Sequence, residues 1–214
     1  MKNVDDLIEN AADLHESGYT KGEIADELNV SRETASWLVD RQLGGERTSQ
    51  TASTGPHDIH VDWSALGRDS NRLFHVAAAM ADFLSKEGED IDLTVGVEKA
   101  GVPLATIVAR ELDTDLSAYT PRKHRWEADD IEELKGSFSH NFADIRGRDC
   151  YIVDDTITSG TTMTETIETV REIGGEPVGC CVLVDKRGVD ELSGVPVHSL
   201  IQVIRVGNDE DTPD

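Results

Sequence analysis

The pattern of apolar positions divides the chain into two parts with different periodicities. In residues 1–43 apolar side chains recur three or four positions apart, which is typical of amphipathic helices. One helix is expected to end at Gly18. A second is expected to begin after Thr20, whose partner Glu23 completes a capping box, and a third after Ser31. This part of the chain is therefore predicted to form a small all-α domain.

After this domain the pattern changes twice. Residues 44–58 have no periodicity and are rich in Gly, Ser and Thr, which predicts a linker, with an ordered arm packed on the next domain as the alternative. From residue 59 short apolar runs alternate with helical stretches. Strands are expected at 93–97, 116–119, 150–154, 178–184 and 200–206, and helices at 66–84, 101–112 and 161–173. This alternation predicts an α/β domain over residues 59–208, a mostly parallel sheet flanked by helices, followed by an acidic tail at 209–214.

The charge of the chain is strongly unbalanced. Its 214 residues include 43 acidic and 20 basic side chains, a formal net charge of -23. Such a surface repels itself and repels nucleic acid in dilute buffer. In a very salty cytoplasm, however, charges are screened within about 3 Å. We interpret the composition as an adaptation to such a cytoplasm, with a merely acidic protein as the alternative.

The cysteines and the chain's apolar runs indicate its compartment. Cys150, Cys180 and Cys181 indicate no disulfide framework, because adjacent cysteines on a strand face opposite sides. We expect all three to be reduced and buried. The N-terminus lacks the apolar core of a signal peptide, and no apolar run approaches the length of a membrane span. The protein is therefore expected to be cytoplasmic, with no membrane partner.

The clearest chemistry lies in residues 150–162, CYIVDDTITSGTT. A strand runs into Asp154 and Asp155, two carboxylates that can accept hydrogen bonds from a ribose diol. A loop before a helix follows, and its backbone N–H groups and hydroxyls can surround a phosphate. The loop residues are Thr158, Ser159, Gly160, Thr161 and Thr162. No Lys follows them, which excludes a nucleotide P-loop. A Thr-rich helix cap is the plainer alternative, but a cap does not require paired carboxylates.

This segment resembles the phosphoribosyl pyrophosphate (PRPP) motif of type I phosphoribosyltransferases, closest to the orotate branch. The resemblance extends across roughly residues 66–206, which implies the fold of that family. Residues 96–105 resemble the family's pyrophosphate loop, although orotate enzymes often carry Lys where this chain has Ala100. The resemblance implies further ligand contacts from Glu98, Lys99, Ala100, Gly101, Arg122 and Lys123. Asp185 to Gly188 resembles one more loop at a strand end.

The chain departs from the orotate enzymes after Lys123. Those enzymes continue into a mobile loop with a Lys and a His that close over the reaction. Here Trp126 stands at the Lys position and Ala128 at the His position, within an acidic stretch where cations would stabilise departing pyrophosphate. His124 and Arg125 would substitute only with a changed loop geometry. We therefore expect a retained ligand site with no catalytic residues and no metal site; the resemblance admits Mg²⁺ only as the companion of a diphosphate ligand.

Residues 20–39 resemble a bacterial- or archaeal-type helix-turn-helix. Ala25 is the small residue needed where two helices cross, and Asn29 stands where many such motifs carry Gly. The third helix would lie in a major groove of DNA. The residues expected at its start and on its exposed face are Ser31, Arg32, Glu33, Thr34 and Ser36. A three-helix protein-interaction cap is the alternative, because residues 1–43 carry ten acids and only four bases.

These two resemblances together indicate a ligand-responsive transcription regulator. The combination is similar to archaeal phosphoribosyltransferase-like regulators of sugar-metabolism genes in halophiles. The expected partners are double-stranded promoter DNA, a second copy of the chain, and an effector that is a phosphorylated sugar, PRPP or a nucleotide. Two alternatives stay open, a working orotate or purine phosphoribosyltransferase with an accessory domain, and a scaffold that does not bind nucleic acid.

Overall fold

The N-terminal part folds into the three expected helices around a core of their own. The computed structural model describes residues 4–43, 58–121 and 136–204. It begins with α1 (Val4–Glu16), α2 (Lys21–Glu27) and α3 (Arg32–Leu43). Thr20 caps α2 with the predicted capping box. Asn29 takes the left-handed conformation expected in the turn, with φ 52°. The core of this domain contains Ile8, Ala11, Ile24, Ala25, Leu28, Val30, Ala35, Leu38 and Val39.

The rest of the described chain forms a mostly parallel sheet with helices on both faces. Its elements are α4 (Ser64–Gly67), α5 (Ser70–Glu87), β1 (Leu93–Val97), α6 (Gly101–Leu112), β2 (Asp115–Thr120), β3 (Ser137–Phe138), β4 (Asp149–Ile157), α7 (Thr161–Ile173), β5 (Glu176–Asp185), β6 (Glu191–Leu192) and β7 (Val195–Gln202). Within the described residues the sheet has seven strands, in the order β3-β2-β1-β4-β5-β7-β6. The predicted α/β class and mostly parallel sheet are confirmed.

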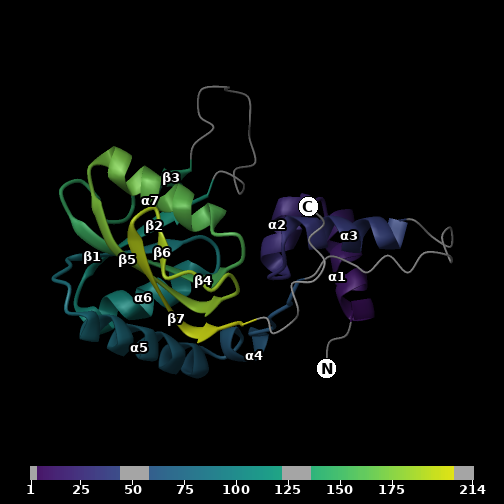
Figure 1. Cartoon of the computed structure of the whole chain (residues 1–214), viewed down its shortest axis with the longest axis horizontal. Coiled ribbons are helices and arrows are strands. Elements are labelled where there is room, and N and C mark those ends of the chain that lie inside the picture. The colour runs from purple at the N-terminus through teal and green to yellow at the C-terminus, as the bar shows by residue number, and fades with distance from the viewer. Residues whose placement is uncertain (1–3, 44–57, 122–135, 205–214) are drawn as a thin grey trace, which may run out of the picture.

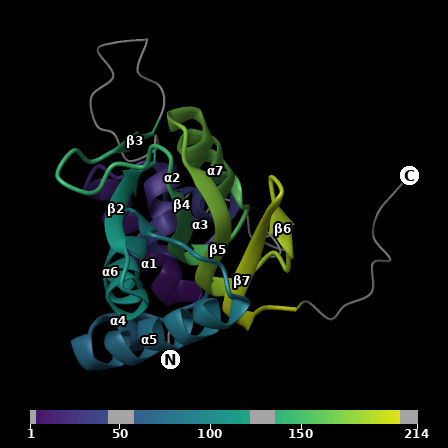
Figure 2. The same ribbon diagram turned by 90° about the vertical axis from the view of Figure 1, so that its left-hand side faces the viewer.

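The arrangement of the layers follows from this order. The inner pairs are parallel, whereas β2 with β3 and β6 with β7 are antiparallel. Figure 1 shows α5 and α6 on one face of the sheet, α7 on the other, and the three-helix domain beside one end of the strands. Figure 2 shows β3 and the β6–β7 hairpin at opposite edges. No helix in the described part of the chain combines the length and the apolar character needed to cross a bilayer.

Two apolar layers pack against the faces of the sheet, and the cysteines are divided between them. Cys150 and Cys180 belong to the layer under α7, and Cys181 belongs to the layer under α5 and α6. All three are buried and free, as predicted. Burial is the main cause that raises the pKa of the Cys150 and Cys181 thiols to about 12, and it also raises the pKa of Cys180. The thiols are therefore held in their neutral, unreactive form.

Three predicted elements have bounds that differ from the structure by more than two residues. The stripe over 66–84 is divided, because the Asp69 carboxylate accepts the amides of Asn71 and Arg72 and starts α5 anew. Strand β4 continues past its two acids to Ile157, because its backbone pairs with β5 as far as Asp185. Strand β7 lies earlier than predicted, at Val195–Gln202, and the short edge strands β3 and β6 were not predicted.

Candidate ligand site between the two domains

A cavity of about 620 Å³ lies between the helix-turn-helix and the carboxyl end of the sheet. One wall is formed by the loop after β1, at residues 98–100, and by residues 154–163 and 165 at the end of β4 and the start of α7. Loops that follow neighbouring parallel strands meet at the same sheet edge, which brings these two sequence-distant segments together. The opposite wall comes from α2, the turn and the start of α3, within residues 23–32. This second wall was not predicted from the sequence.

The two adjacent acids lie where β4 approaches the cavity. Asp154 Oδ1 accepts the Asp155 amide at 2.8 Å. Gly101, the first residue of α6, packs directly on this strand. A Cβ at Gly101 would lie 2.6 Å from the Val153 carbonyl oxygen and 2.8 Å from the Asp154 Cα, closer than such atoms approach. The absence of a side chain therefore allows the pyrophosphate-loop segment to lie against the acidic pair.

The hydroxyl-rich loop at residues 158–162, which we call the phosphate loop, leads from β4 into the start of α7. Gly160 takes a positive φ of 81° at the N-cap of this 13-residue helix. The Ser159 and Thr161 hydroxyls are 3.0 Å apart, and Arg187 Nη1 donates to the Ser159 carbonyl at 2.7 Å. The amides of the first helical turn and the helix dipole favour an anion at this point. This geometry is compatible with the phosphate site that the sequence predicts.

A buried carboxylate fixes the turn that carries Arg187. Asp185 is 1% exposed. Its Oδ1 accepts the amides of Arg187 and Gly188 at 2.8 and 3.0 Å, and its Oδ2 accepts the amide of Val189 at 3.0 Å. The sequence marked this segment only as a loop at a strand end. The Asp-Lys-Arg-Gly spacing was the available signal, but it did not reveal which side chain faces the phosphate loop.

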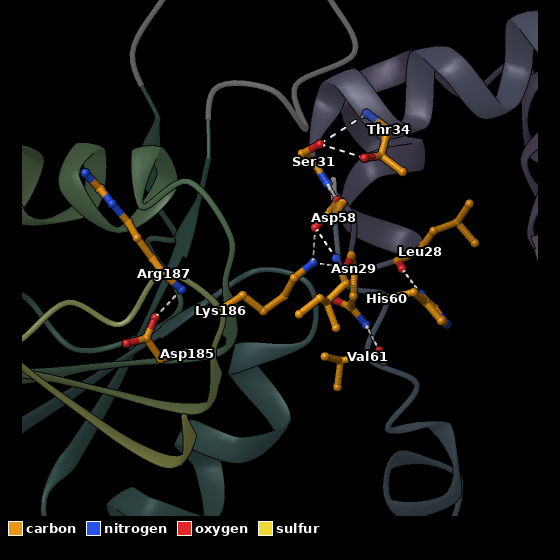
Figure 3. A network of polar contacts seen from close by, with 11 residues as sticks. Leu28, Asn29, Ser31, Thr34, Asp58, His60, Val61, Asp185, Lys186 and Arg187 are labelled. Atoms are coloured by element: carbon orange, nitrogen blue, oxygen red, sulfur yellow. Dashed lines mark hydrogen bonds and ion pairs between the residues drawn. The ribbon is translucent and has the colours of Figure 1, made fainter. Parts of the chain in front are cut away.

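The Asp155 carboxylate is contacted from residues 29 and 63, outside the sheet. Trp63 Nε1 donates to Asp155 Oδ2 at 2.9 Å, and the Thr156 hydroxyl donates to the same oxygen at 3.3 Å. The Asn29 amide has two orientations. In one, its nitrogen donates to Asp155 Oδ2 and its oxygen accepts from Trp63 Nε1, each at 3.3 Å. In the other, drawn in Figure 3, the nitrogen donates to the Val61 carbonyl at 3.3 Å. We assign the first, because it gives both amide atoms suitable partners.

Burial shifts the pKa of this acid. It is the largest influence on Asp155, and it raises the pKa of the carboxyl above its ordinary value despite hydrogen bonds that lower the pKa, including those donated by Trp63 and Thr156. The ionised form is therefore disfavoured in the folded protein. A partner that supplies hydrogen-bond donors to this oxygen pair would relieve that penalty.

The expected pyrophosphate-loop residues have partners of their own. Glu98 Oε2 accepts the Thr120 hydroxyl at 2.8 Å, and the peptide bond between Glu98 and Lys99 is cis. Lys99 Nζ lies 5.4 Å from the centroid of the Tyr19 ring in the helical domain, a cation–π contact across the cavity. Ala100 precedes α6 and also lines the cavity. Arg122, Lys123 and the predicted departure at 124–133 lie outside the described residues.

The cavity is acidic for a phosphate site. Its lining residues include two bases, Arg32 and Lys99. The acids among them are Glu23, Asp26, Glu27, Glu98, Asp154, Asp155 and Glu165. In the described residues no cluster of three or more His, Cys, Asp or Glu side chains could hold a metal ion. Among the described residues, the groups of this cavity that favour a phosphate are therefore the backbone amides and hydroxyls of residues 158–162 and these two bases.

One of the predicted DNA-facing residues is inside the helical domain. Thr34 is 9% exposed, and its hydroxyl lies 2.9 Å from that of Ser31. The expectation that Thr34 lies on the exposed face is wrong, because this side chain completes the cap of α3. Ser31 Oγ accepts the Thr34 amide at 3.1 Å. The Ser31 amide donates to Asp58 at 2.5 Å, so Ser31 also has an internal role.

The other three candidates are on the surface of the helical domain. Glu33 is exposed. Arg32 is exposed as well and lines the cavity, where its Nη2 would lie 3.3 Å from a Cβ on Gly22. Ser36 Oγ accepts from Lys21 Nζ at 2.7 Å. The start of α3 thus presents one cation toward the same cavity that the phosphate loop faces.

Comparisons with known proteins match the sheet domain to one family profile and the whole chain to named regulators. The profile of the phosphoribosyl transferase domain family matches residues 62–204. Transcriptional regulator GfcR of Haloarcula marismortui is 66% identical over 212 residues, covering 99% of this chain and all of that protein. Its counterpart in Haloquadratum walsbyi is 64% identical over 217 residues, covering 100% of this chain and 98% of that protein. Orotate phosphoribosyltransferase from Aeropyrum pernix has a TM-score of 0.54 at 25% identity, covering 77% of this chain and 92% of that one. The match to the regulators includes the three helices, which precede the family profile.

Proposed function

This chain belongs to the phosphoribosyl transferase domain family and is a relative of proteins named transcriptional regulator GfcR; from that premise we propose that it regulates transcription by binding promoter DNA and sensing a phosphorylated effector. Genes of sugar and central carbon metabolism are the expected targets, as its similarity to regulators of such genes implies. The observation that carries the proposal is the shared cavity, which has the phosphate loop on one wall and the start of the recognition helix on the other. An effector bound there touches both domains.

The effector is a phosphorylated sugar, PRPP or a related nucleotide. Its phosphate binds at residues 158–162, where the amides of α7 and the loop hydroxyls face the cavity. Its ribose hydroxyls donate to Asp154 and Asp155, and each such charged hydrogen bond contributes about 1.5–3 kcal/mol. If the effector is PRPP, residues 98–101 with Arg122 and Lys123 hold the diphosphate, and Mg²⁺ accompanies it.

The domain binds this ligand without transferring the ribosyl group. Trp126 and Ala128 replace the Lys and His that orotate enzymes use to close over the reaction. The acidic side chains around them oppose the negative charge that develops on departing pyrophosphate. The names of the full-length relatives, which are those of regulators, support this part of the proposal.

DNA binding falls to α3 in a homodimer in the cytoplasm, since two half-sites require two recognition helices. The excess of acids suits a very salty cytoplasm, and the two relatives named above come from haloarchaea. Residues 1–43 supply few phosphate contacts, because they carry only four bases. Sequence preference then depends on contacts with base edges more than on attraction to phosphates.

Calorimetry tests the effector site. The full chain, in molar potassium chloride, is titrated by calorimetry with ribose 5-phosphate and with PRPP. The double variant Asp154→Asn with Asp155→Asn is expected to lose affinity for both. Asp149→Asn, the same change at the exposed start of strand β4, is the matched control and is expected to bind like the unaltered chain.

Operator DNA is obtained from the same chain by selection of genomic fragments in molar salt. Addition of the effector is expected to change the affinity for that DNA. Unaltered binding of both phosphosugars by the double variant would remove Asp154 and Asp155 from the site. Failure to retain any DNA would favour the scaffold alternative. Pyrophosphate release from PRPP, Mg²⁺ and orotate at about 1 s⁻¹ or faster would favour the enzyme.

A further inference from the structure

Residues 58–63 lie between the two domains and bond to both (Figure 3). Asp58 Oδ1 lies 2.9 Å from Lys186 Nζ, and the two side chains are 9% and 3% exposed. Asp58 Oδ2 accepts the Ser31 amide at 2.5 Å, and Lys186 also donates to the Asn29 carbonyl at 2.8 Å. A buried ion pair thus fixes the turn of the helix-turn-helix to the strand end of the sheet. We call residues 58–63 and these partners the joint.

The joint also holds a histidine that is only partly satisfied. His60 Nδ1 donates to the Leu28 carbonyl at 2.6 Å. Its Nε2 is buried and has no hydrogen-bond partner among the described residues. An unpaired buried acceptor costs free energy, and it regains water if the joint opens. The closed joint is therefore stabilised by the ion pair but is not satisfied at every polar atom.

Two groups expected to bind the effector already have partners, one in the joint and one in the helical domain. Trp63 Nε1, which belongs to the joint, donates to Asp155 Oδ2 at 2.9 Å. Lys99 Nζ stacks on Tyr19 of the helical domain, 5.4 Å from the ring centroid. A ribose hydroxyl that donates to Asp155 Oδ2 would occupy the place that the indole N–H now takes. A diphosphate that pairs with Lys99 draws the ammonium away from the ring.

We propose that Trp63 is a built-in competitor of the effector at Asp155, so that effector binding opens the joint and frees the helix-turn-helix from the sheet domain. The inference rests on the proposed function, because it assumes that the ribose diol binds at this acid. The indole is displaced when the diol supplies donors to the same carboxylate. The contacts of Asn29 with Trp63 and Asp155 are then lost from the turn that precedes the recognition helix.

The turn after β5 links the two events. Asp185 accepts the Arg187 amide, and the side chains of Lys186 and Arg187 in this turn point apart (Figure 3). Arg187 donates to the phosphate loop at Ser159, while Lys186 holds Asp58 and Asn29. A shift of the phosphate loop on ligand binding therefore moves the residue next to the ion pair. This is a continuous path of contacts from the phosphate loop to the joint.

Effector binding and opening of the joint are thermodynamically linked, and this linkage can be measured. If the effector favours the open joint, a change that favours the open joint raises the affinity for the effector, at most by the factor by which it shifts the equilibrium between the closed and open forms. The closed fraction lowers the apparent affinity of the unaltered chain. Trp63→Phe removes the indole N–H but keeps a ring that packs on Gly67. We expect this variant to bind ribose 5-phosphate and PRPP about tenfold more tightly, the scale of one hydrogen bond to a charged group.

The matched control is Trp37→Phe, which removes an indole from the helical domain away from the joint. Trp37 packs on the core of that domain and under Arg41. Its replacement is expected to leave both affinities unchanged. Hydrogen exchange supplies a second measurement that needs no variant. The Ser31 amide donates to Asp58 in the closed joint, so ribose 5-phosphate is expected to accelerate its exchange.

The outcomes separate this inference from the proposed function. If Asp155→Asn binds both probes like the unaltered chain, or if neither probe binds any variant, the effector site fails and the inference fails with it. If Asp155→Asn loses binding while Trp63→Phe and Trp37→Phe both match the unaltered chain, the effector site stands and the competition is refuted. Weaker binding by Trp63→Phe would show that the indole holds the ligand. Unchanged exchange of the Ser31 amide on binding would also overturn the opening of the joint.

Discussion

The buried Asp58–Lys186 ion pair of the joint is expected to make the stability of the protein depend on pH in the acidic range. Burial is the largest influence on the pKa of Asp58 and raises it. The Ser31 amide, the hydrogen bond and charge of Lys186, and the Ile59 amide together outweigh burial, and the pKa falls from 3.8 to about 2. At about 1.36 kcal/mol per pH unit, this depression corresponds to about 2 kcal/mol of stability. For a carboxyl with a lowered pKa, this stability is present above about pH 4 and is lost as the pH falls through about 2.

The perturbation is Asp58→Asn, followed by urea unfolding in molar potassium chloride at a series of pH values. Other carboxylates titrate in both proteins, so the difference between them isolates Asp58. The variant is expected to be less stable by about 3–5 kcal/mol near neutral pH, because it leaves Lys186 buried without its partner. The difference in unfolding free energy between the two proteins is expected to narrow as the pH falls from 4 toward 2, where the unaltered Asp58 also becomes neutral.

The partner residue completes a double-mutant cycle. Lys186→Met on the Asp58→Asn background is expected to restore part of the loss, because it removes the unpaired charge. The control pair is Lys86 with Asp82, which is 2.6 Å apart but lies 71% and 65% exposed and is expected to couple weakly. A gap that stays constant with pH would refute the role of Asp58 ionisation. Coupling in the joint no larger than in the surface pair would refute the buried clamp.

Four further predictions follow from the site and the core. Asp155→Asn is expected to raise the urea midpoint of the unliganded protein at neutral pH, because the raised pKa of this acid means that its ionised form destabilises the fold; the gain should vanish in acid, and a lower midpoint would contradict the reasoning. The three cysteines are expected to resist iodoacetamide in the folded protein and react after unfolding, since burial keeps them neutral; alkylation of the folded chain, read by mass spectrometry, would refute this. Pyrophosphate release from PRPP, Mg²⁺ and orotate is expected to stay well below about 1 s⁻¹. Arg32→Ala is expected to erase the preference for operator over scrambled DNA, about 1–3 kcal/mol for a bidentate contact with guanine, and to leave stability nearly unchanged; equal preference in both proteins by fluorescence anisotropy, or a steep loss of binding with salt, would exclude this mode of recognition.

The helices and inner strands could be predicted because their signals are local. A capping box lies within four residues, and the apolar run of β1 is continuous. The end of β4 was harder to predict, because Asp and Thr side chains do not favour a strand. The backbone pairing with β5 decides that end, and this pairing is a tertiary effect. Asp69 was a local signal for the start of α5, but the long apolar stripe around it concealed the break.

The phosphate loop and the joint differ in how far the sequence could predict them. The phosphate loop is one continuous motif, so its residue types and order were enough to indicate the ligand chemistry. The joint depends on contacts between residues far apart in the chain. Trp63 and Asp155 are separated by 92 positions, and Lys186 and Asn29 by 157. Asp58 was assigned to the linker by its composition, and the structure instead places its carboxylate in a buried ion pair.

The separation of the ion pair from the ligand groups explains how one chain can keep both a stable fold and a responsive site. Asp155 is an acid whose ionised form is disfavoured in the folded protein, so hydrogen-bond donors to its carboxylate stabilise the ionised form. In the closed joint Trp63 is such a donor, and in the bound state the ribose diol would replace it. Lys186 and Asp58 form a separate pair within the joint, so the loss of the indole contact does not require this pair to break. When the joint opens as proposed, the helical domain gives up its contacts at Ser31 and Asn29, while the Asp58–Lys186 pair can stay with the sheet domain.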